Sequence, residues 1–177
     1  AHVVGYSMGG DIANKVRERH PLRLHTVTMG GVGRGVLKGW TTSDFDYMKI
    51  AESLERGEGL KVVFREPNGA GRRTLSETEI EEWNNRFVQG QDQLALAAVI
   101  RAYSDLEVSE ESLKNNAVPT LVVVGEYDPE KPTADELRDL MKNVSVVVIP
   151  DRDHFDAGTT PEFHRKVVDF LKSHGGK

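Results

Sequence analysis

A serine between two glycines near the start of the chain is the first candidate for chemistry. The segment Gly5-Tyr6-Ser7-Met8-Gly9 has the pattern of a sharp strand-to-helix turn that exposes a serine hydroxyl. Such a turn holds the serine at positive φ and brings the strand and helix backbones together, so we expect side chains at positions 5 and 9 to collide there. The pattern predicts Ser7 as a nucleophile, and an ordinary glycine-rich turn is the alternative.

A serine hydroxyl is a weak nucleophile at neutral pH, so it needs a base and an acid nearby. An imidazole must take its proton, and a carboxylate must hold that imidazole in the right tautomer. Asp128 follows an apolar run that ends at Val124, and loops leaving the carboxyl ends of parallel strands carry site residues. We expect Asp128 to be the acid. A turn aspartate before Pro129 is the alternative, and Glu126 is the substitute if Asp128 faces solvent.

His154 is the predicted base among the six histidines of the chain. It lies just after the apolar run that ends at Ile149 and before the last predicted helix, while the other histidines lie in predicted strands or on helical positions that look exposed. Two acidic neighbours, Asp153 and Asp156, compete with Asp128 as the partner of its imidazole. The amide of Met8, at the start of a predicted helix, is the expected oxyanion donor.

Aromatic residues are the candidates for substrate contact. Tyr6 lies inside the serine turn. Four aromatics further along the chain could line an acyl pocket: Trp40, Phe45, Tyr47 and Phe64. Packing between helices explains most of these four equally well. The histidines and carboxylates have no compact metal-ligand spacing, and residues 30–35 match a dinucleotide loop only loosely. We therefore expect no metal and no cofactor.

Alternating strand and helix patterns flank a helical segment and must position these residues. The patterns predict parallel strands, helices around them, and helical stretches at 45–56, 76–88 and 91–103. The predicted strands are His2–Tyr6, Leu24–Met29, Thr120–Val124 and Val144–Ile149, and the predicted helices of the same part are Met8–Arg19, Thr133–Met141 and Pro161–Leu171. The first strand is apolar on both faces, so we expect it to be buried on both.

The chain therefore divides into an α/β core and a helical insertion. We expect the core to comprise residues 1–33 and 109–177, and the insertion to comprise residues 34–108. Within the insertion, Pro and Gly are dense between Glu66 and Gly71, which is typical of a mobile turn that acts as a hinge.

Composition limits the classes of partner. The chain has 177 residues, 38% of them hydrophobic and 29% charged, with a net charge of −5. It offers no basic field for nucleic acid and no apolar run of membrane-spanning length. Cysteine is absent, which fits a reducing compartment, and no signal-peptide pattern leads the sequence. We expect a cytoplasmic protein that acts on a small molecule.

Together the Gly5 to Gly10 turn, the Gly125 to Asp128 loop and the Asp153-His154-Phe155 turn resemble the α/β-hydrolase superfamily, in its esterase-like group with a helical cap. The resemblance implies a mostly parallel sheet with flanking helices and a cap from about 34 to 108. It also implies hydrolysis of small carboxylic esters through an acyl-serine intermediate, with Ser7, Asp128 and His154 as the triad. Perhydrolase chemistry uses the same triad.

The resemblance also implies elements before the nucleophile strand, including the loop that gives the second oxyanion donor. Only six residues precede Ser7, so the chain is expected to lack the N-terminal half of that fold. The alternative function of the chain is therefore that of a weakly active hydrolase, or of a non-catalytic relative that binds a ligand, because its oxyanion hole is incomplete. A second consequence is a free edge on the strand His2–Tyr6, which invites pairing with another strand. We expect a second copy, or a separate chain with the N-terminal half, to cover it.

Overall fold

The structure is a computed structural model, and it describes residues 1–33, 47–65 and 74–175. It forms two compact units. The first comprises Ala1–Leu37 and Leu106–Lys177, and the second comprises Lys38–Asp105. The sequence-based boundaries fall at 33/34 and 108/109. Each unit is described by itself below.

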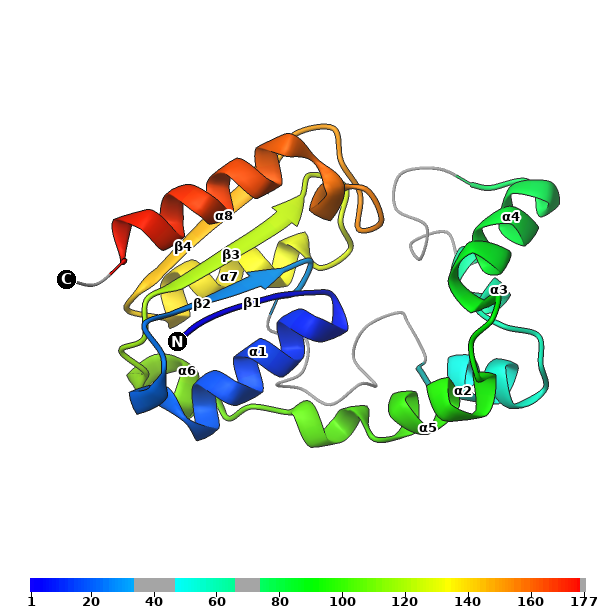
Figure 1. The fold of residues 1–177 in the computed structure, drawn as a ribbon, viewed down its shortest axis with the longest axis horizontal. Helices are drawn as coiled ribbons and strands as arrows, with labels where there is room; N and C mark the ends of the chain where they lie inside the picture. Colours follow the sequence, from blue (N-terminus) through cyan, green and yellow to red (C-terminus); the bar gives the residue numbers. More distant parts are fainter. Residues whose placement is uncertain (34–46, 66–73, 176–177) are drawn as a thin grey trace. The chain divides into compact units, whose positions relative to one another are not determined.

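A four-stranded parallel sheet is the centre of the first unit (Figure 1). Its strands, in their order across the sheet, are β1 (His2–Tyr6), β2 (Thr26–Gly30), β3 (Thr120–Gly125) and β4 (Val144–Ile149). All three pairings are parallel, as the sequence predicts. Parallel strands end at the same edge of a sheet, so the loops after β1, β3 and β4 leave from one edge.

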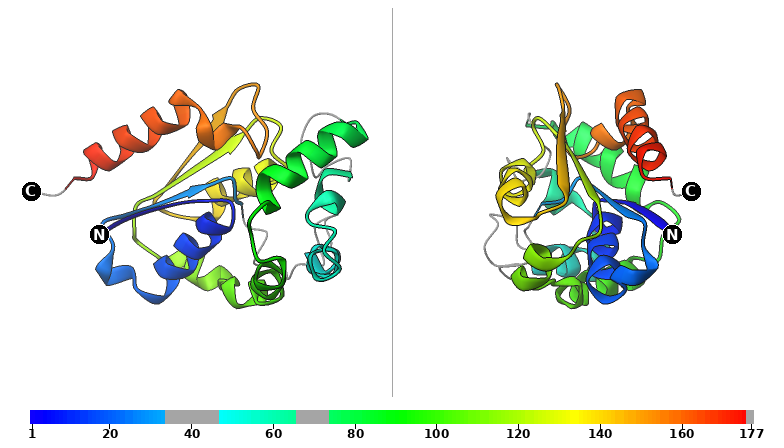
Figure 2. Two further views of the ribbon diagram at one scale, coloured as in Figure 1. Left: turned by 45° about the vertical axis from the view of Figure 1, so that its right-hand side comes forward. Right: turned by 90° about the vertical axis from the view of Figure 1, so that its left-hand side faces the viewer.

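Helices cover both faces of this sheet, and Figure 2 shows α7 and α8 on opposite sides of it. Side chains alternate along a strand, so β3 gives Val122 and Val124 to one core cluster and Leu121 and Val123 to the other. The first cluster includes residues of α1 (Met8–Arg19), α6 (Glu110–Asn115) and α7 (Lys131–Leu140), and the second includes residues of α8 (Pro161–Ser173). Short 3-10 turns, η1 (Pro21–Arg23) and η4 (Ala157–Thr159), complete the described elements of this unit.

The strand β1 differs from its prediction. It was expected to be buried on both faces, yet none of its five residues is fully buried, and Val4 is 47% exposed. Within the described residues β1 pairs only with β2. An outer strand lacks a neighbour on one side, and apolar residues are not enough to bury it.

The second unit is helical in its described residues. It contains α2 (Tyr47–Glu55), α3 (Lys61–Arg65), α4 (Glu77–Val88) and α5 (Gln93–Arg101), followed by the 3-10 turn η3 (Tyr103–Leu106) at its boundary. Its core includes Ile50, Leu54 and Ala97. The helix α4 begins with a capping box, in which Ser76 and Glu79 each bond the other's backbone N–H. The predicted hinge from Glu66 to Gly71 lies outside the described residues.

Candidate active site

The turn between β1 and α1 holds Ser7 in a strained conformation. Ser7 has φ 54° and ψ −126°, a region that residues other than glycine rarely adopt. A Cβ at Gly5 would lie 1.9 Å from the Gly9 carbonyl oxygen, so the close approach of strand and helix requires glycine at position 5. The sharp turn predicted from the sequence is therefore present.

The predicted collision at position 9 is wrong. A Cβ at Gly9 would meet nothing within 4 Å, whereas one at Gly10 would lie 2.9 Å from Val32 Cγ2 and 3.0 Å from the Gly30 carbonyl oxygen. Gly9 approaches the strand through its backbone, which is what excludes a side chain at Gly5. The helix then packs against the segment after β2 through Gly10.

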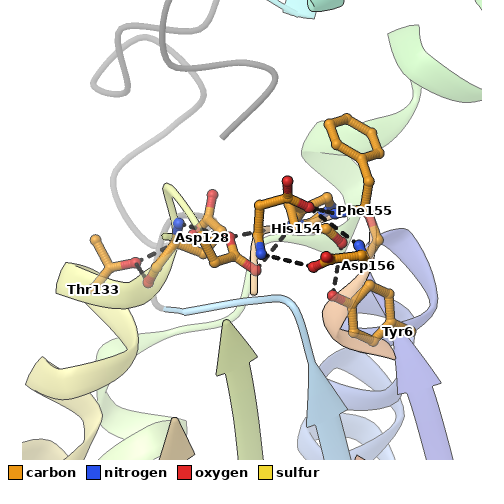
Figure 3. A network of polar contacts seen from close by, with 9 residues as sticks. Tyr6, Asp128, Thr133, His154, Phe155 and Asp156 are labelled. Carbon is orange, nitrogen blue, oxygen red and sulfur yellow. Dashed lines mark hydrogen bonds and ion pairs between the residues drawn. The ribbon is translucent and has the colours of Figure 1, made fainter. Parts of the chain in front are cut away.

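Three side chains meet where β1, β3 and β4 end. The Ser7 hydroxyl lies 2.9 Å from Nε2 of His154. The other ring nitrogen, Nδ1, lies 3.1 Å from Oδ2 and 3.2 Å from Oδ1 of Asp128. Figure 3 shows His154 and Asp128 among the surrounding polar groups. This is the hydrogen-bonded order of nucleophile, base and acid that a serine triad needs.

The Asp128 loop is held by the His154 loop next to it. The backbone N–H of Tyr127 donates to the Arg152 carbonyl at 2.9 Å, and a Cβ at Gly125 would lie 2.4 Å from that same oxygen. Asp128 itself is 3% exposed, and its Oδ1 accepts from the Glu130 N–H at 2.9 Å. The substitute acid, Glu126, accepts instead from the Asp151 N–H at 3.0 Å.

The two acidic neighbours of His154 shape its own turn. Asp153 Oδ1 accepts from the N–H groups of Phe155 and Asp156, at 2.9 and 3.1 Å. Asp156 Oδ1 accepts in return from the Asp153 N–H at 2.8 Å. These carboxylates therefore bond the backbone of the turn, and the carboxylate that is hydrogen-bonded to the imidazole is that of Asp128.

Opposing effects set the pKa of His154. Burial disfavours the imidazolium and lowers the pKa, but the hydrogen bond and charge of Asp128 raise it, with help from Glu130 and Asp153. The net pKa lies above its usual value near 6.5. A base of this kind is well suited to hold a proton taken from Ser7.

Glu130 is a second carboxyl near the triad that the sequence analysis did not identify. Burial and the charge of Asp128 raise its pKa, although the Thr133 hydroxyl, His154 and the Gly33 N–H favour the ionised form. The Thr133 hydroxyl lies 3.2 Å from its Oε2, and Figure 3 includes Thr133 beside Asp128. Its place two residues after Asp128 in the same loop was the available signal.

The remaining predicted site residues are in different surroundings. Met8 begins α1, and the first N–H groups of a helix have no intrahelical acceptor, so its amide is free of the helix ladder beside Ser7. Tyr6 donates its hydroxyl to the His154 carbonyl at 2.7 Å. Tyr47 lies in the second unit and stacks on Tyr103, while Trp40 and Phe45 lie outside the described residues.

Two absences concern the described residues only. Among residues 1–33, 47–65 and 74–175, no group of three or more His, Asp or Glu side chains is arranged to hold a metal ion. No helix in that same part of the chain is long and apolar enough to cross a membrane.

Comparison with known proteins identifies the fold. No protein-family model and no curated protein matches the sequence, but solved structures match its fold. A MenH structure from S. aureus has a TM-score of 0.78 at 21% identity, covering 99% of this chain and 69% of that one. The structure of a thermophilic esterase has a TM-score of 0.70 at 24% identity, with 99% and 67% covered. The chain has the α/β-hydrolase fold.

A third α/β-hydrolase structure, an esterase from Thermogutta terrifontis, has a TM-score of 0.74 at 19% identity and covers 98% of this chain and 65% of that one. The chain thus spans about two thirds of the length of these structures. Identities of this size establish the fold and nothing finer.

Proposed function

We propose that the chain is a serine hydrolase that cleaves small carboxylic esters through an acyl-serine intermediate. The observation that carries the proposal is the continuous relay from Ser7 Oγ through His154 to Asp128, with contacts of 2.9 and 3.1 Å. An α/β-hydrolase fold, which this chain shares with a thermophilic esterase, supports the same reading. A cytoplasmic location remains part of this proposal.

In the first half of the reaction, Ser7 Oγ attacks the ester carbonyl while Nε2 of His154 takes the hydroxyl proton. Asp128 accepts the hydrogen bond from Nδ1–H and stabilises the imidazolium. The tetrahedral oxyanion accepts from the Met8 N–H at the start of α1, where the helix dipole favours negative charge. The imidazolium then gives its proton to the departing alkoxide, which leaves as the alcohol. Ser7 is left acylated.

In the second half, water replaces the alcohol. Nε2 of His154 takes a proton from the water, the hydroxide adds to the acyl carbon, and the C–O bond to Ser7 breaks with return of the proton to Ser7 Oγ. The products are a carboxylic acid and the free enzyme. Replacing water with hydrogen peroxide gives a peracid by the same steps.

The oxyanion site decides how fast this chain turns over. Met8 supplies one donor, and the described residues offer no second one that we identify. Loss of one oxyanion donor costs about 10²–10³ in rate. A weakly active hydrolase, or a relative that binds the ligand without turnover, is therefore the second candidate. Both candidates share the Ser7 relay and differ in rate.

Labelling with a fluorophosphonate tests the nucleophile without needing fast turnover. We expect one label per folded chain on the peptide that contains Ser7, and none on Ser7→Ala or on urea-unfolded protein. Ser145→Ala is the matched control, because Ser145 is an exposed serine in β4, and it should label like the parent. The proposal fails if Ser7 in the folded parent stays unlabelled while a known serine esterase in the same tube is labelled.

Hydrolysis of p-nitrophenyl acetate then separates the two candidates. Rates of the parent, Ser7→Ala and Ser145→Ala are compared, because exposed histidines hydrolyse such esters slowly without a serine. A parent rate well above that of Ser7→Ala supports the esterase. Labelling of Ser7 with a rate equal to that of Ser7→Ala supports the weakly active relative.

A further inference from the structure

The Tyr6 ring occupies a slot made by three glycines. A Cβ at Gly30 would lie 2.5 Å from Tyr6 Cδ2, one at Gly31 would lie 2.9 Å from Cζ, and one at Gly158 would lie 2.7 Å from Cε2. Phe163 packs edge-on against the ring, with centroids 5.5 Å apart. Any side chain larger than hydrogen at these glycines would displace the ring, so its position is closely determined.

The hydroxyl of Tyr6 ends on the backbone of the proposed base. It donates to the His154 carbonyl at 2.7 Å (Figure 3). Burial raises the pKa of Tyr6 far above its usual value near 10, and the negative charge of Asp128 raises it further. The phenol therefore stays protonated, and it remains a donor throughout the working pH range.

This hydrogen bond links the turn that holds Ser7 to the backbone of His154. Tyr6 is bonded directly to Ser7 in the chain, and the carbonyl that it holds belongs to His154, 148 positions away. The Tyr6 and His154 rings also lie 5.7 Å apart between centroids. A movement of the His154 backbone away from the sheet would break this bond as well as lengthen the distance from Nε2 to Ser7 Oγ.

We infer that Tyr6 is a positioning residue: its hydroxyl ties the backbone of His154 to the serine turn and keeps the base in line with the nucleophile. The inference rests on the proposed function, and it assigns Tyr6 a role other than the substrate contact expected from the sequence. A residue that positions the base acts on the rate of the chemical step. A residue that contacts substrate acts on KM.

Tyr6→Phe tests this, because it keeps the ring in its slot and removes only the hydroxyl, which donates to the His154 carbonyl and accepts from the Gly158 backbone N–H. The matched control is Asn143→Ala, which removes another side-chain bond to a carbonyl, from Asn143 Nδ2 to Ala117 at 2.8 Å, at the start of β4 instead of its end. Two kinetic measurements are made on each variant: the rate of fluorophosphonate labelling, and kcat and KM for p-nitrophenyl acetate. The local structure is followed by amide hydrogen exchange at Phe155 and by the ¹⁵N spectrum of the His154 imidazole.

We expect Tyr6→Phe to slow labelling and to lower kcat by about tenfold to a hundredfold, the size expected when a catalytic group is misplaced by a fraction of an ångström to an ångström. KM stays unchanged, exchange at Phe155 becomes faster, and the His154 signals shift or broaden. Asn143→Ala changes none of these. Gly158→Ala, whose methyl would displace the ring, should act in the same direction as Tyr6→Phe.

Three results would overturn the inference. One is a higher KM with unchanged kcat, which makes Tyr6 a substrate contact. Another is equal slowing in Asn143→Ala, which makes the effect one of general stability. The last is unchanged exchange and an unchanged imidazole spectrum in Tyr6→Phe. If the parent itself is not labelled at Ser7, the proposed function fails, and exchange with the imidazole spectrum still decides whether Tyr6 holds His154.

Discussion

Asp128→Asn removes the negative charge opposite His154 and leaves the shape of the side chain almost unchanged. The size of the expected loss of rate follows from the distance of 3.1 Å between Asp128 Oδ2 and His154 Nδ1. At this distance two unit charges attract by about 5 kcal/mol with an effective dielectric constant near 20. That attraction stabilises the imidazolium formed during attack, and about 1.4 kcal/mol is a factor of ten in rate. The full loss is thus roughly four orders of magnitude.

The asparagine amide recovers part of this loss and adds a second problem. Its oxygen still accepts one neutral hydrogen bond, of about 1 kcal/mol, so we expect kcat to fall by about 10³–10⁴. Its NH₂ group can instead donate to Nδ1, which stabilises the tautomer with Nε2 protonated and unable to accept the Ser7 proton. Folding should change little, because the oxygen that accepts from the Glu130 N–H is retained.

The assay compares kcat for p-nitrophenyl acetate in the parent, Asp128→Asn and Glu126→Gln. Glu126 is the matched control, since it carries the same charge in the same loop but bonds the Asp151 N–H. We expect Glu126→Gln to keep nearly the parent rate. The reasoning is refuted if Asp128→Asn, folded by circular dichroism, loses less than tenfold, or if Glu126→Gln loses as much.

Three further predictions concern pH, the serine turn and the sheet edge. His154 must be neutral to accept a proton, and its pKa lies above 6.5. We therefore expect kcat/KM to rise with pH through a midpoint above 6.5. A profile that is flat from pH 5 to 8 would contradict a histidine base. Gly5→Ala should lower the free energy of unfolding by about 3 kcal/mol or more, because its Cβ would meet the Gly9 carbonyl. Gly9→Ala should leave the free energy of unfolding unchanged or raise it by up to about 1 kcal/mol. Equal urea midpoints for the two variants would exclude this account of the turn. We propose that the edge of β1 pairs with a strand of a second copy, or of a separate chain that supplies the N-terminal half. If the partner is a second copy, light scattering should detect a dimer of the purified chain that Val4→Lys dissociates, and a monomer would exclude that partner.

The sequence predicted those elements whose pattern is local. The strands β1 and β4 have the predicted bounds because each is a short apolar run with β-branched residues between turn signals. The helix α1 also begins and ends where its apolar spacing predicts. The short helices α3 and α6, of five and six residues, were not predicted. Helices this short are not stable in isolation and depend on tertiary contacts, which a local pattern does not contain.

The choice among carboxylates shows the same limit at the site. Asp153 and Asp156 are nearest to His154 in the sequence, and four acidic side chains were left open as its partner or substitute. Three of them bond backbone N–H groups of the loops instead. Nearness in sequence favours such local bonds. The partner in space, Asp128, comes from another strand.

The register of the sheet places the relay. Gly125 at the end of β3 pairs with Ile149 at the end of β4, so the loops that carry Asp128 and His154 leave the sheet side by side and are joined by the bond from Tyr127 to Arg152. At the other end of the relay, Ser7 N–H donates to the Gly30 carbonyl at 2.8 Å, which fixes the serine turn to β2. Backbone bonds therefore hold both ends of the relay. A slip of one residue between neighbouring strands would move a loop by about 3.3 Å and turn every side chain of that strand to the other face, a distance greater than the whole contact from Ser7 to His154.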